Sequence, residues 1–334
     1  MAKNTNLHRA KSAKNDEHYT LYRDIENELK HYKNHFKGKT VICNCDDPRC
    51  SNFFKYFTVN FEWLELKRVI ATCYKSQDAD LFSKQDSEKA IWVEYTGDKN
   101  GNRYPDPEEM TIHEFTGDGD FRSEECIELL KQADIVVTNP PFSLLREFVS
   151  LLMEHEKKFL IIGNKNAITY KEIFPLLKEG KIWLGCVPIV KQFMVPKGLD
   201  RKNTFTKDGK LYAEFGNIGW YTNLTHKKRN EELILFRKYN PKDYPKYDNY
   251  DAIEVSKVVD IPCDYAGVMG VPITFMDKYN PEQFKILGLA QGSKDKNILG
   301  IDFIGEKDAR PLIGGKNKYA RIFIRNKNPK PPEE

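Results

Sequence analysis

Two hydrophobic patterns alternate along the first half of the chain. Short apolar runs bounded by turn residues are typical of buried strands, and they occur at 40–45, 67–74, 90–95, 134–138, 159–163 and 181–186. Between them, apolar side chains recur at helical spacing, as in a helix ended by Gly38 whose inner face is Tyr22, Ile25, Leu29, Tyr32 and Phe36. This alternation predicts an α/β domain over residues 16–186, built on a doubly wound parallel sheet.

Capping residues predict where several of the helices begin. Ser123 and Ser143 each stand directly before a helical pattern, as an N-cap residue does. Thr169 has a glutamate three residues later, which is the spacing of a capping box, and this predicts a helix that ends near Gly180. Asn280 is followed by a proline and, three residues on, by a glutamine, and we expect another short helix there.

The pattern changes after Cys186. Helical periodicity is lost, aromatic and asparagine residues become more frequent, and short β runs occur at 218–224, 233–237 and 321–325, while 271–276 is apolar. The stretch 244–250 is aromatic and polar, which is unsuited to a core strand. We therefore predict a smaller, mixed α+β region over 187–325. A basic flexible arm at 1–15 and a disordered tail at 326–334 complete the chain.

The composition is that of a globular protein in a reducing compartment. The 334 residues are 40% hydrophobic and 31% charged, and no stretch approaches the length of a membrane span. Seven cysteines, an odd number, do not suggest a disulfide framework. Cys43, Cys45 and Cys50 lack the spacing of a zinc site, so we interpret them as core residues and expect no metal. These features favour a cytoplasmic protein.

Charge is unevenly distributed along the chain, although the net charge is only +4. Residues 191–230 hold nine Lys or Arg against three Asp or Glu, whereas residues 75–120 hold five against twelve. A basic segment of this kind suggests a polyanionic partner. An ordinary solvated surface explains the same pattern equally well at this point.

The turn Asn139-Pro-Pro-Phe142 is the strongest candidate for chemistry. Neither proline can donate to a sheet ladder, so the turn must follow the buried run 134–138, at the edge where open α/β sheets bind ligands. The Asn139 side-chain oxygen and the Pro140 carbonyl can accept the two N–H bonds of an amino group conjugated to a ring, which localises its lone pair. Phe142 can stack on that ring, while Pro140 and Pro141 stiffen the turn.

Two other turns are expected at the same edge. Asp46 and Asp47 follow the first strand, and Asp118, Asp120 and Phe121 follow the strand that ends near Phe115. Carboxylates there can bind a ribose or an α-amino group, and the aromatic ring can face an adenine. One carboxylate alone is more often a turn residue. Three such turns on one edge favour a shared pocket.

Longer phrases resemble the EcoRI-type adenine-specific DNA methyltransferases over about residues 10–325. They are Asp16-Glu-His-Tyr-Thr20, Cys43-Asn-Cys-Asp-Asp-Pro-Arg49, Ser51-Asn-Phe-Phe-Lys-Tyr-Phe57, Gly117-Asp-Gly-Asp-Phe-Arg-Ser123, Thr138-Asn-Pro-Pro-Phe-Ser143, Lys181-Ile-Trp-Leu-Gly185, Tyr244-Pro-Lys-Tyr-Asp-Asn-Tyr-Asp-Ala-Ile253 and Gly267-Val-Met-Gly-Val-Pro-Ile-Thr-Phe275. The resemblance implies a Rossmann-like, S-adenosylmethionine-dependent methyltransferase sheet, with 187–325 as the target-recognition region. It also implies N6 methylation of adenine in double-stranded DNA.

The resemblance further implies the biological setting and the residues of the site. The setting is a restriction–modification system or an orphan methylase, bacterial or phage-encoded, with a possible cognate endonuclease that shares the DNA site without a stable complex. The cofactor candidates are Tyr19, Thr20, Asn44, Asp46, Asp47, Pro48, Asp120 and Phe121. The catalytic candidates are Asn139, Pro140, Pro141 and Phe142. The chain departs from the wider pattern at residues 49–51, where glycines are usual, and after Tyr74, where no acidic residue follows to hold the ribose.

DNA recognition is expected from the second half of the chain. A stacked adenine cannot reach a methyl donor, so it must be flipped out of the duplex. Basic residues then hold phosphates, while contacts to base edges select the site. Lys227, Lys228, Arg229 and Tyr247 are the candidates for these contacts.

Two alternatives stay open at this point. Asn-Pro-Pro-aromatic turns also occur in methyltransferases that act on guanine amino groups in RNA and on glutamine side chains in proteins. A binding protein that kept the fold and lost the cofactor is the second alternative, because the first turn lacks its glycines.

Overall fold

Two compact units make up the chain in the computed structural model, which describes residues 18–45, 47–73, 90–195, 203–292, 299–304 and 309–331. Unit 1 comprises Met1–Lys165 and Gly185–Leu224, and unit 2 comprises Asn166–Leu184 and Thr225–Glu334. The predicted arm at 1–15 and the last residues of the predicted tail lie outside the described residues.

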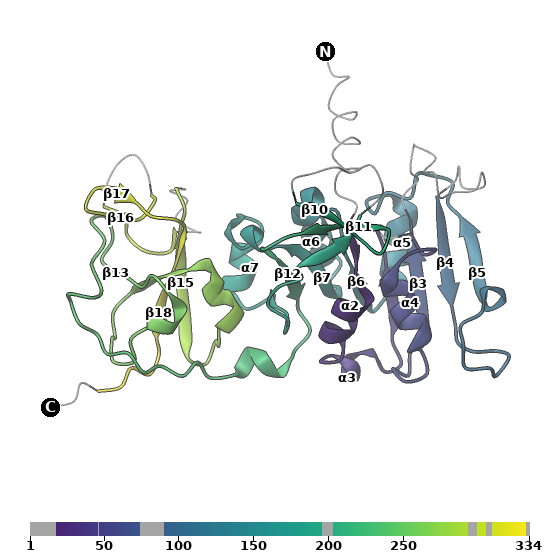
Figure 1. Ribbon diagram of the computed structural model, residues 1–334, viewed down its shortest axis with the longest axis horizontal. Coiled ribbons are helices and arrows are strands. Elements are labelled where there is room, and N and C mark those ends of the chain that lie inside the picture. Colours follow the sequence, from purple (N-terminus) through teal and green to yellow (C-terminus); the bar gives the residue numbers. More distant parts are fainter. Residues whose placement is uncertain are drawn as a thin grey trace, which may run out of the picture. The chain divides into compact units, whose positions relative to one another are not determined.

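A mixed sheet forms the centre of unit 1 (Figure 1). Its strands, in spatial order, are β5 (Met110–Glu114), β4 (Ile91–Tyr95), β3 (Arg68–Thr72), β2 (Thr40–Cys43), β6 (Ile135–Thr138), β7 (Lys158–Asn164) and β12 (Ile218–Thr222). The four strands β3, β2, β6 and β7 are parallel. β4 is antiparallel to β3, β5 to β4, and β12 to β7.

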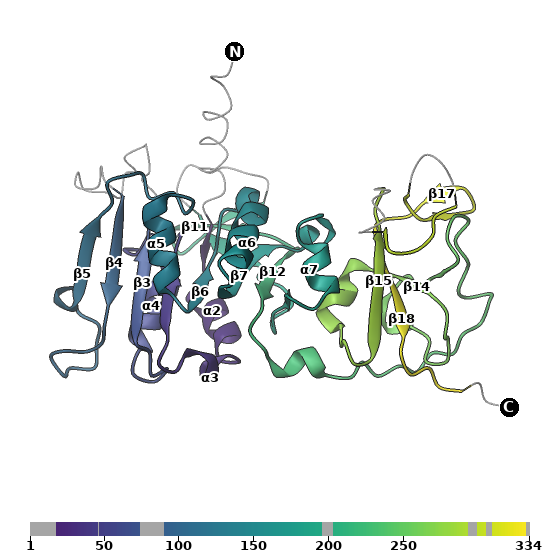
Figure 2. The same cartoon turned by 180° about the vertical axis from the view of Figure 1, so that it is seen from behind.

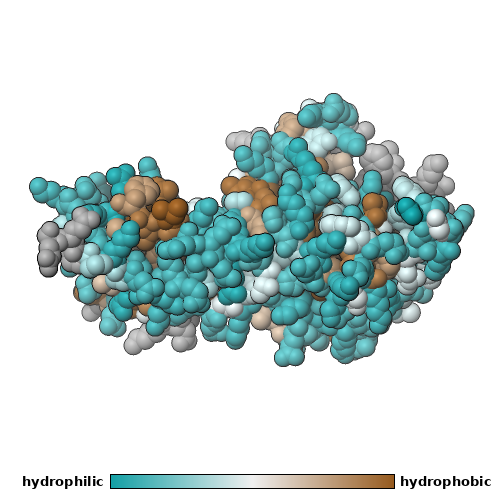
Figure 3. Space-filling view, turned by 90° about the horizontal axis from the view of Figure 1, so that it is seen from below, coloured by the Kyte–Doolittle hydropathy of each residue, from teal (hydrophilic) through white to brown (hydrophobic). Residues whose placement is uncertain are grey.

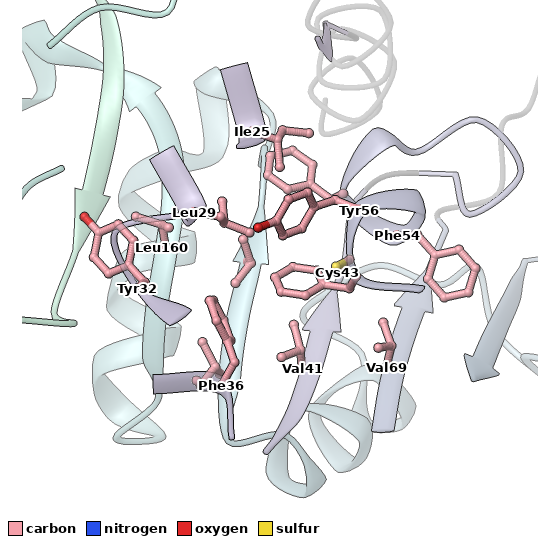
Figure 4. Close-up of a cluster of buried hydrophobic side chains, with 14 of the residues drawn as sticks. Ile25, Leu29, Tyr32, Phe36, Val41, Cys43, Phe54, Tyr56, Val69 and Leu160 are labelled. Atoms are coloured by element: carbon pink, nitrogen blue, oxygen red, sulfur yellow. The ribbon is translucent and has the colours of Figure 1, made fainter. Parts of the chain in front are cut away.

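Helices cover both faces of this sheet, as comparison of Figures 1 and 2 shows. One face carries α2 (Tyr22–Leu29), α3 (Lys33–Phe36) and α4 (Asn52–Val59), and the other carries α5 (Glu124–Gln132) and α6 (Leu145–Glu154). Side chains of a strand point alternately to its two faces, so Val41 and Cys43 of β2 meet the first group of helices. Figure 4 shows these side chains beside Ile25, Leu29 and Phe36, which are fully buried.

A second, smaller sheet belongs to unit 1. It is antiparallel, and its strands in order are β1 (Tyr19–Thr20), β9 (Gln192–Met194), β11 (Lys210–Glu214) and β10 (Thr204–Lys207). In Figure 1, β10 and β11 lie above the carboxyl ends of the parallel strands. This sheet therefore borders the edge at which the sequence predicts a pocket.

Unit 2 has a separate four-stranded sheet. The order of its strands is β13 (Ile253–Glu254), β14 (Met269–Pro272), β18 (Arg321–Asn326) and β15 (Phe284–Ala290). β13 and β14 are parallel, and the other pairs are antiparallel. The remaining elements are α7 (Phe174–Lys178), β8 (Trp183–Leu184) and the hairpin of β16 (Leu312–Ile313) and β17 (Lys316–Asn317).

The α/β prediction is confirmed, with helices on both faces, but the sheet is mixed and not parallel throughout. A parallel crossover needs a long connection, usually a helix, whereas β4 and β5 are joined by a turn-rich loop and pair as neighbours. The run at 218–224, predicted to lie in the target-recognition region, forms β12 beside β7. The run at 233–237 makes only one isolated bridge, from Arg237 to Pro262.

Capping residues predicted some helix starts and not others. Ser123 caps α5 by accepting from the Cys126 backbone N–H, as expected. Ser143 caps no helix, because it lies inside a 3-10 turn, η2 (Phe142–Leu144), and α6 starts after it. No helix begins at Thr169, which ends another 3-10 turn, or at Asn280, whose side chain closes a turn before β15.

The predicted first helix is divided into α2 and α3. The N–H groups of His31 and Tyr32 bond to carbonyls three residues back, so the chain tightens between the two helices. Ile25, Leu29, Tyr32 and Phe36 remain buried. The predicted apolar face was therefore correct, although the helix is not continuous.

No helix in the part of the chain described is long and apolar enough to cross a membrane. The face of the molecule in Figure 3 is mostly hydrophilic, with apolar side chains in separate small groups.

Candidate active site

The turn after β6 holds Asn139 in a fixed orientation. Its side-chain Nδ2 donates to the His18 carbonyl oxygen at 2.5 Å. Its Oδ1 is buried and has no hydrogen-bond partner among the described residues. Buried polar atoms without a partner are rare in folded proteins. Because the amide nitrogen is already anchored, the oxygen is a pre-oriented acceptor for a ligand.

The two prolines separate Asn139 from Phe142 as the sequence predicts. Pro140 is buried, Pro141 is half-buried with φ −52° and ψ 126°, and neither belongs to a strand. The chain then enters η2 and α6, whose buried Leu145 and Phe148 fix the turn to the sheet. The four catalytic candidates thus form one short, stiff segment at the carboxyl edge.

Hydrogen bonds from side chains to backbone carbonyls join the segments that meet at this edge. The Thr138 hydroxyl at the end of β6 donates to the Asn44 carbonyl, directly after β2. Asn52 at the start of α4 donates through Nδ2 to the Thr20 carbonyl at 2.7 Å. The sequence predicted Thr20 and Asn44 as cofactor residues, and the structure brings both to the same edge as Asn139.

Two further side-chain oxygens at this edge are buried and have no partner among the described residues. They are Thr20 Oγ1 and Asn44 Oδ1. Thr20 is 2% exposed and Asn44 is 4% exposed. Three such atoms lie on adjoining segments, and no described residue satisfies their hydrogen-bonding capacity. An unfilled set of this kind suits a polar ligand.

The first cofactor turn contains a strained residue that is not a glycine. Cys45 has φ +69°, a left-handed conformation that is uncommon outside glycine. Asp46 lies outside the described residues. Asp47 forms an ion pair with Arg49, with Oδ2 2.6 Å from Nη2, and Pro48 is buried. Ser51 then caps α4.

The second acidic turn has the same internal pairing. Asp120 Oδ2 lies 2.6 Å from Nη2 of Arg122, which also reaches Glu147 at 2.8 Å. Burial alone would raise the pKa of Asp120, but hydrogen bonds and charge from Arg122 outweigh it and hold that pKa below its usual value. Gly119 has φ +73°, and a Cβ there would lie 2.5 Å from the Cys73 carbonyl oxygen. Close contact with the end of β3 therefore requires glycine.

Phe121 is more buried than we expect for a ring that stacks on the adenine of a cofactor. It is 7% exposed, and its ring packs edge-on against Phe148 with centroids 5.1 Å apart. The Arg122 guanidinium lies 5.2 Å from the centre of the same ring. Contact between this ring and a bound adenine requires Arg122 to move, so the predicted role of Phe121 stays a prediction.

An aromatic cluster surrounds Phe142. The His18 ring stacks on it, with centroids 5.3 Å apart and planes 18° apart. Phe193 and Phe215 present their edges, at 6.1 Å and 6.2 Å from Phe142. Sequence reasoning gave no role to these three residues, because they approach Phe142 from β9, from the end of β11 and from the start of β1. Only the phrase around Tyr19 contained a signal, since His18 is part of it.

The predicted DNA contacts all lie in unit 2, and they have different environments. Lys227 is exposed and Lys228 half-buried, in the turn η4 (Lys227–Asn230). The Arg229 guanidinium lies 3.7 Å from the centre of the Trp183 ring, and burial lowers its pKa. Arg229 is therefore engaged within its own unit in this structure, and its predicted phosphate contact stays a prediction.

Tyr247 is a core residue of unit 2, and its prediction as a DNA contact was wrong. It is 5% exposed, and its hydroxyl donates to Glu254. Arg321 pairs with the same carboxylate, with Nη2 2.6 Å from Oε1. Tyr244 and Tyr250 are buried as well. The stretch 244–250 can enter the core because its tyrosine hydroxyls find buried partners.

The cysteine interpretation is partly confirmed. Cys43 is buried in β2, Cys45 is half-buried and Cys50 is exposed, so only the first is a core residue. Within the described ranges, no group of His, Cys, Asp and Glu side chains could hold a metal ion.

A mixed α/β sheet with an Asn-Pro-Pro-Phe turn at its carboxyl edge is consistent with a methyltransferase fold, and this is the class that fold and site indicate. The family model described as adenine-specific methyltransferase EcoRI matches residues 6–327, so the chain belongs to that family. The resemblance inferred from the sequence is confirmed.

Three relatives extend over almost the whole chain. Type II methyltransferase M.EcoRI of Escherichia coli is 49% identical over 98% of this chain and 98% of its own length. Type II methyltransferases M.MgeORF184P of Mycoplasma genitalium and M.MpnI of Mycoplasma pneumoniae are 40% and 39% identical, each over 96% of this chain and 98% of their own lengths. No solved structure matches the chain significantly.

Proposed function

We propose that this protein transfers a methyl group from S-adenosylmethionine to N6 of an adenine that it flips out of duplex DNA. The observation that carries the proposal is the buried and oriented Oδ1 of Asn139, which has no hydrogen-bond partner among the described residues and belongs to the same short turn as Phe142. Membership of the adenine-specific methyltransferase family supports the choice of base.

The chemistry follows from what the turn can accept. The lone pair of an exocyclic amine is delocalised into its ring, which makes the nitrogen a poor nucleophile. The Asn139 oxygen and the Pro140 carbonyl would accept its two N–H bonds and favour a tetrahedral nitrogen with a localised lone pair. Phe142 would stack on the base, and the prolines would keep the acceptors from turning away.

The carboxyl edge fits the proposed cofactor. S-adenosylmethionine carries an α-amino group, a carboxylate, a ribose and an adenine, all of which need polar partners. The unpartnered Thr20 Oγ1 and Asn44 Oδ1 are suited to such groups, and Tyr19, Asp46, Asp47, Pro48, Asp120 and Phe121 complete the proposed set. When bound, the cofactor supplies an electrophilic methyl group.

Asp47 and Asp120 would have to exchange partners to take part. Each is now neutralised by an arginine two residues later in the chain. A cationic α-amino group or a ribose hydroxyl would compete with those arginines for the carboxylates. The pairs hold both carboxylates in place until a ligand arrives.

The biological setting is part of the same proposal. A DNA adenine methyltransferase of this kind would act in the cytoplasm, within a restriction–modification system or as an orphan methylase. A cognate endonuclease would share the DNA site without forming a stable complex. Unit 2, with Lys227 and Lys228 exposed or half-exposed, is the proposed target-recognition part.

The decisive experiment compares nucleic acids from a bacterial host without its own adenine methylases. The wild-type gene and Asn139→Ala are expressed separately, and DNA, RNA and protein are analysed by mass spectrometry. We expect N6-methyladenine in DNA from the wild-type culture alone, and sequencing then locates the methylated site. Methylation confined to RNA or to glutamine side chains, or no methylation at all, would refute the proposal.

A further inference from the structure

One face of Phe142, the ring that is proposed to stack on the target base, is already covered by another ring. His18 lies nearly parallel to Phe142, and it is 7% exposed. Phe193 and Phe215 enclose the imidazole edge-on, at 6.0 Å and 4.9 Å between centroids and with planes 79° apart in both cases. His18 therefore occupies an aromatic cage.

His18 contacts two of the residues that the proposed function assigns to the base. Its ring stacks on Phe142, and its carbonyl oxygen accepts from Nδ2 of Asn139. Imidazole is also one of the two fused rings of adenine, so its planar shape and ring nitrogens imitate part of the proposed substrate. A base and the imidazole cannot both stack on the same face of Phe142.

We propose that the His18 ring holds the place of the target base in the DNA-free enzyme, and that the flipped adenine displaces it from the cage. This inference rests on the proposed function and adds a residue to it. His18 is a positioning residue: its ring fills the space beside Phe142, Phe193 and Phe215 until the base enters.

The displacement is a side-chain rotation, because the backbone around His18 is held at several points. Tyr19 and Thr20 pair with Met194 and Phe193 of β9. The Thr20 carbonyl accepts from Asn52, and the His18 carbonyl accepts from Asn139. Rotation about the Cα–Cβ bond of His18 frees Phe142 without breaking any of these contacts, so Asn139 keeps its orientation when the base arrives.

The displacement of His18 also reduces the net free energy that favours capture of the flipped base. An entering base gains its own stack on Phe142 but removes that of His18, so only the difference favours the flipped state. Adenine has a larger aromatic surface than imidazole and wins this exchange. Removing the competing ring should therefore strengthen base capture without changing how the enzyme binds the rest of the duplex.

The first experiment follows the His18 ring directly. Wild-type protein labelled with ¹³C at histidine is titrated with an unmethylated duplex that contains the enzyme's target sequence. The His18→Phe variant assigns the His18 signals, because these signals are absent from its spectrum. In the free enzyme these signals should lie upfield, because Phe142 shields them. With the cognate duplex they should lose this shift. With the same duplex made abasic at the target position they should keep it.

The second experiment measures base capture as a ratio: the dissociation constant for the abasic duplex divided by that for the adenine duplex. His18→Ala should raise this ratio roughly 2- to 10-fold, the factor that corresponds to one aromatic pair. His18→Phe restores a competing ring and should return the ratio toward the wild-type value. His31→Ala, a change at an exposed histidine in the same unit, is the matched control.

The outcomes separate this inference from the proposed function. If wild-type enzyme does not methylate adenine in DNA, the function itself fails. If it does, and His18 stays shielded in the cognate complex or loses its shift with every duplex, then only the placeholder role is overturned. An unchanged or lower ratio in a folded His18→Ala variant also overturns it.

Discussion

The side-chain nitrogen of Asn139 and the carbonyl oxygen of His18 lie 2.5 Å apart, although the two residues are separated by 121 positions in the chain. This bond leaves the amide no freedom to exchange its oxygen and nitrogen. Asn139 therefore presents an acceptor at the carboxyl edge, which is what the proposed amine chemistry needs.

Asn139→Ala should remove an interaction made mainly in the transition state. We expect single-turnover methylation to slow by about 100-fold or more, in line with the loss of one oriented oxyanion-hole donor. Affinities for DNA and S-adenosylmethionine should change little. Asn34→Ala, at an exposed position on α3, is the control and should retain full activity. A fully active Asn139→Ala enzyme would contradict the proposed role.

Asp120 should contribute stability that depends on pH. Its pKa lies below the ordinary value of 3.8 in the folded protein, because the partnership with Arg122 outweighs burial. A carboxylate with a depressed pKa stabilises the fold fully above its unfolded pKa, and this contribution is lost as pH falls through the folded pKa. The free energy of unfolding of the wild type relative to Asp120→Asn should therefore be constant above pH 3.8 and decrease below it.

Denaturant unfolding followed by tryptophan fluorescence, repeated across this pH range, provides the measurement. Asp251→Asn changes the same kind of group at a side chain that is 98% exposed, and is the matched control. A difference between wild type and Asp120→Asn that persists unchanged in acid would mean that the pair with Arg122 does not lower the pKa.

Lys227 and Lys228 should differ from Arg229 in what they contribute. Replacing both lysines with alanine should weaken binding to all DNA sequences alike, and should lower the slope of log Kd against log salt by about 2. Removing two exposed lysines elsewhere in unit 2, Lys285 and Lys316, controls for net charge. Equal slopes for the two double variants would exclude a specific phosphate contact at η4.

Arg229→Ala should instead affect the fold of unit 2. Its guanidinium covers the Trp183 ring and donates to the Gly180 carbonyl at 3.5 Å, so its loss removes packing as well as charge. We expect lower thermal stability with an unchanged salt slope. A normal melting temperature combined with a reduced slope would assign Arg229 to DNA after all.

The Glu254–Arg321 pair should be strongly sensitive to the loss of one partner. Both side chains are at most 10% exposed, and Arg321 approaches the carboxylate through Nε and Nη2. Glu254→Ala leaves a buried guanidinium unpaired, which should cost about 3–5 kcal/mol. Hydrogen exchange in β14 and β18 measures this cost locally. The triple change Glu254→Leu, Arg321→Met and Tyr247→Phe should cost much less, since no buried charge remains.

Local sequence patterns were sufficient where one segment determines its own structure. The buried run before Asn139 and the two prolines after it predict the strand, its end and the turn, and β6 and η2 follow them. Ser123 was correctly predicted as the N-cap of α5 for the same reason. Ser143 was not, because the prolines lead the chain into a 3-10 turn before α6 begins.

Tertiary contacts explain the residues that the sequence did not predict. His18, Phe193 and Phe215 meet at Phe142 from distant parts of the chain, and no spacing rule connects them. Tyr247 was wrongly predicted as a DNA contact for a similar reason. Its hydroxyl makes it resemble a surface residue in the sequence, whereas Glu254 satisfies that hydroxyl inside the core. The antiparallel positions of β4 and β12 likewise depend on partners that the strand patterns do not specify.

The position of β12 determines how this protein can be dissected. The chain passes between its units after Lys165, Leu184 and Leu224, so neither unit is a contiguous stretch. A fragment that stops at residue 186 would lack β12 and leave the edge of β7 open for pairing with other chains. During synthesis the same edge stays uncovered until residues 218–222 leave the ribosome. Separate expression of the methyl-transferring part therefore has to join 1–165 to 185–224 rather than cut the chain once.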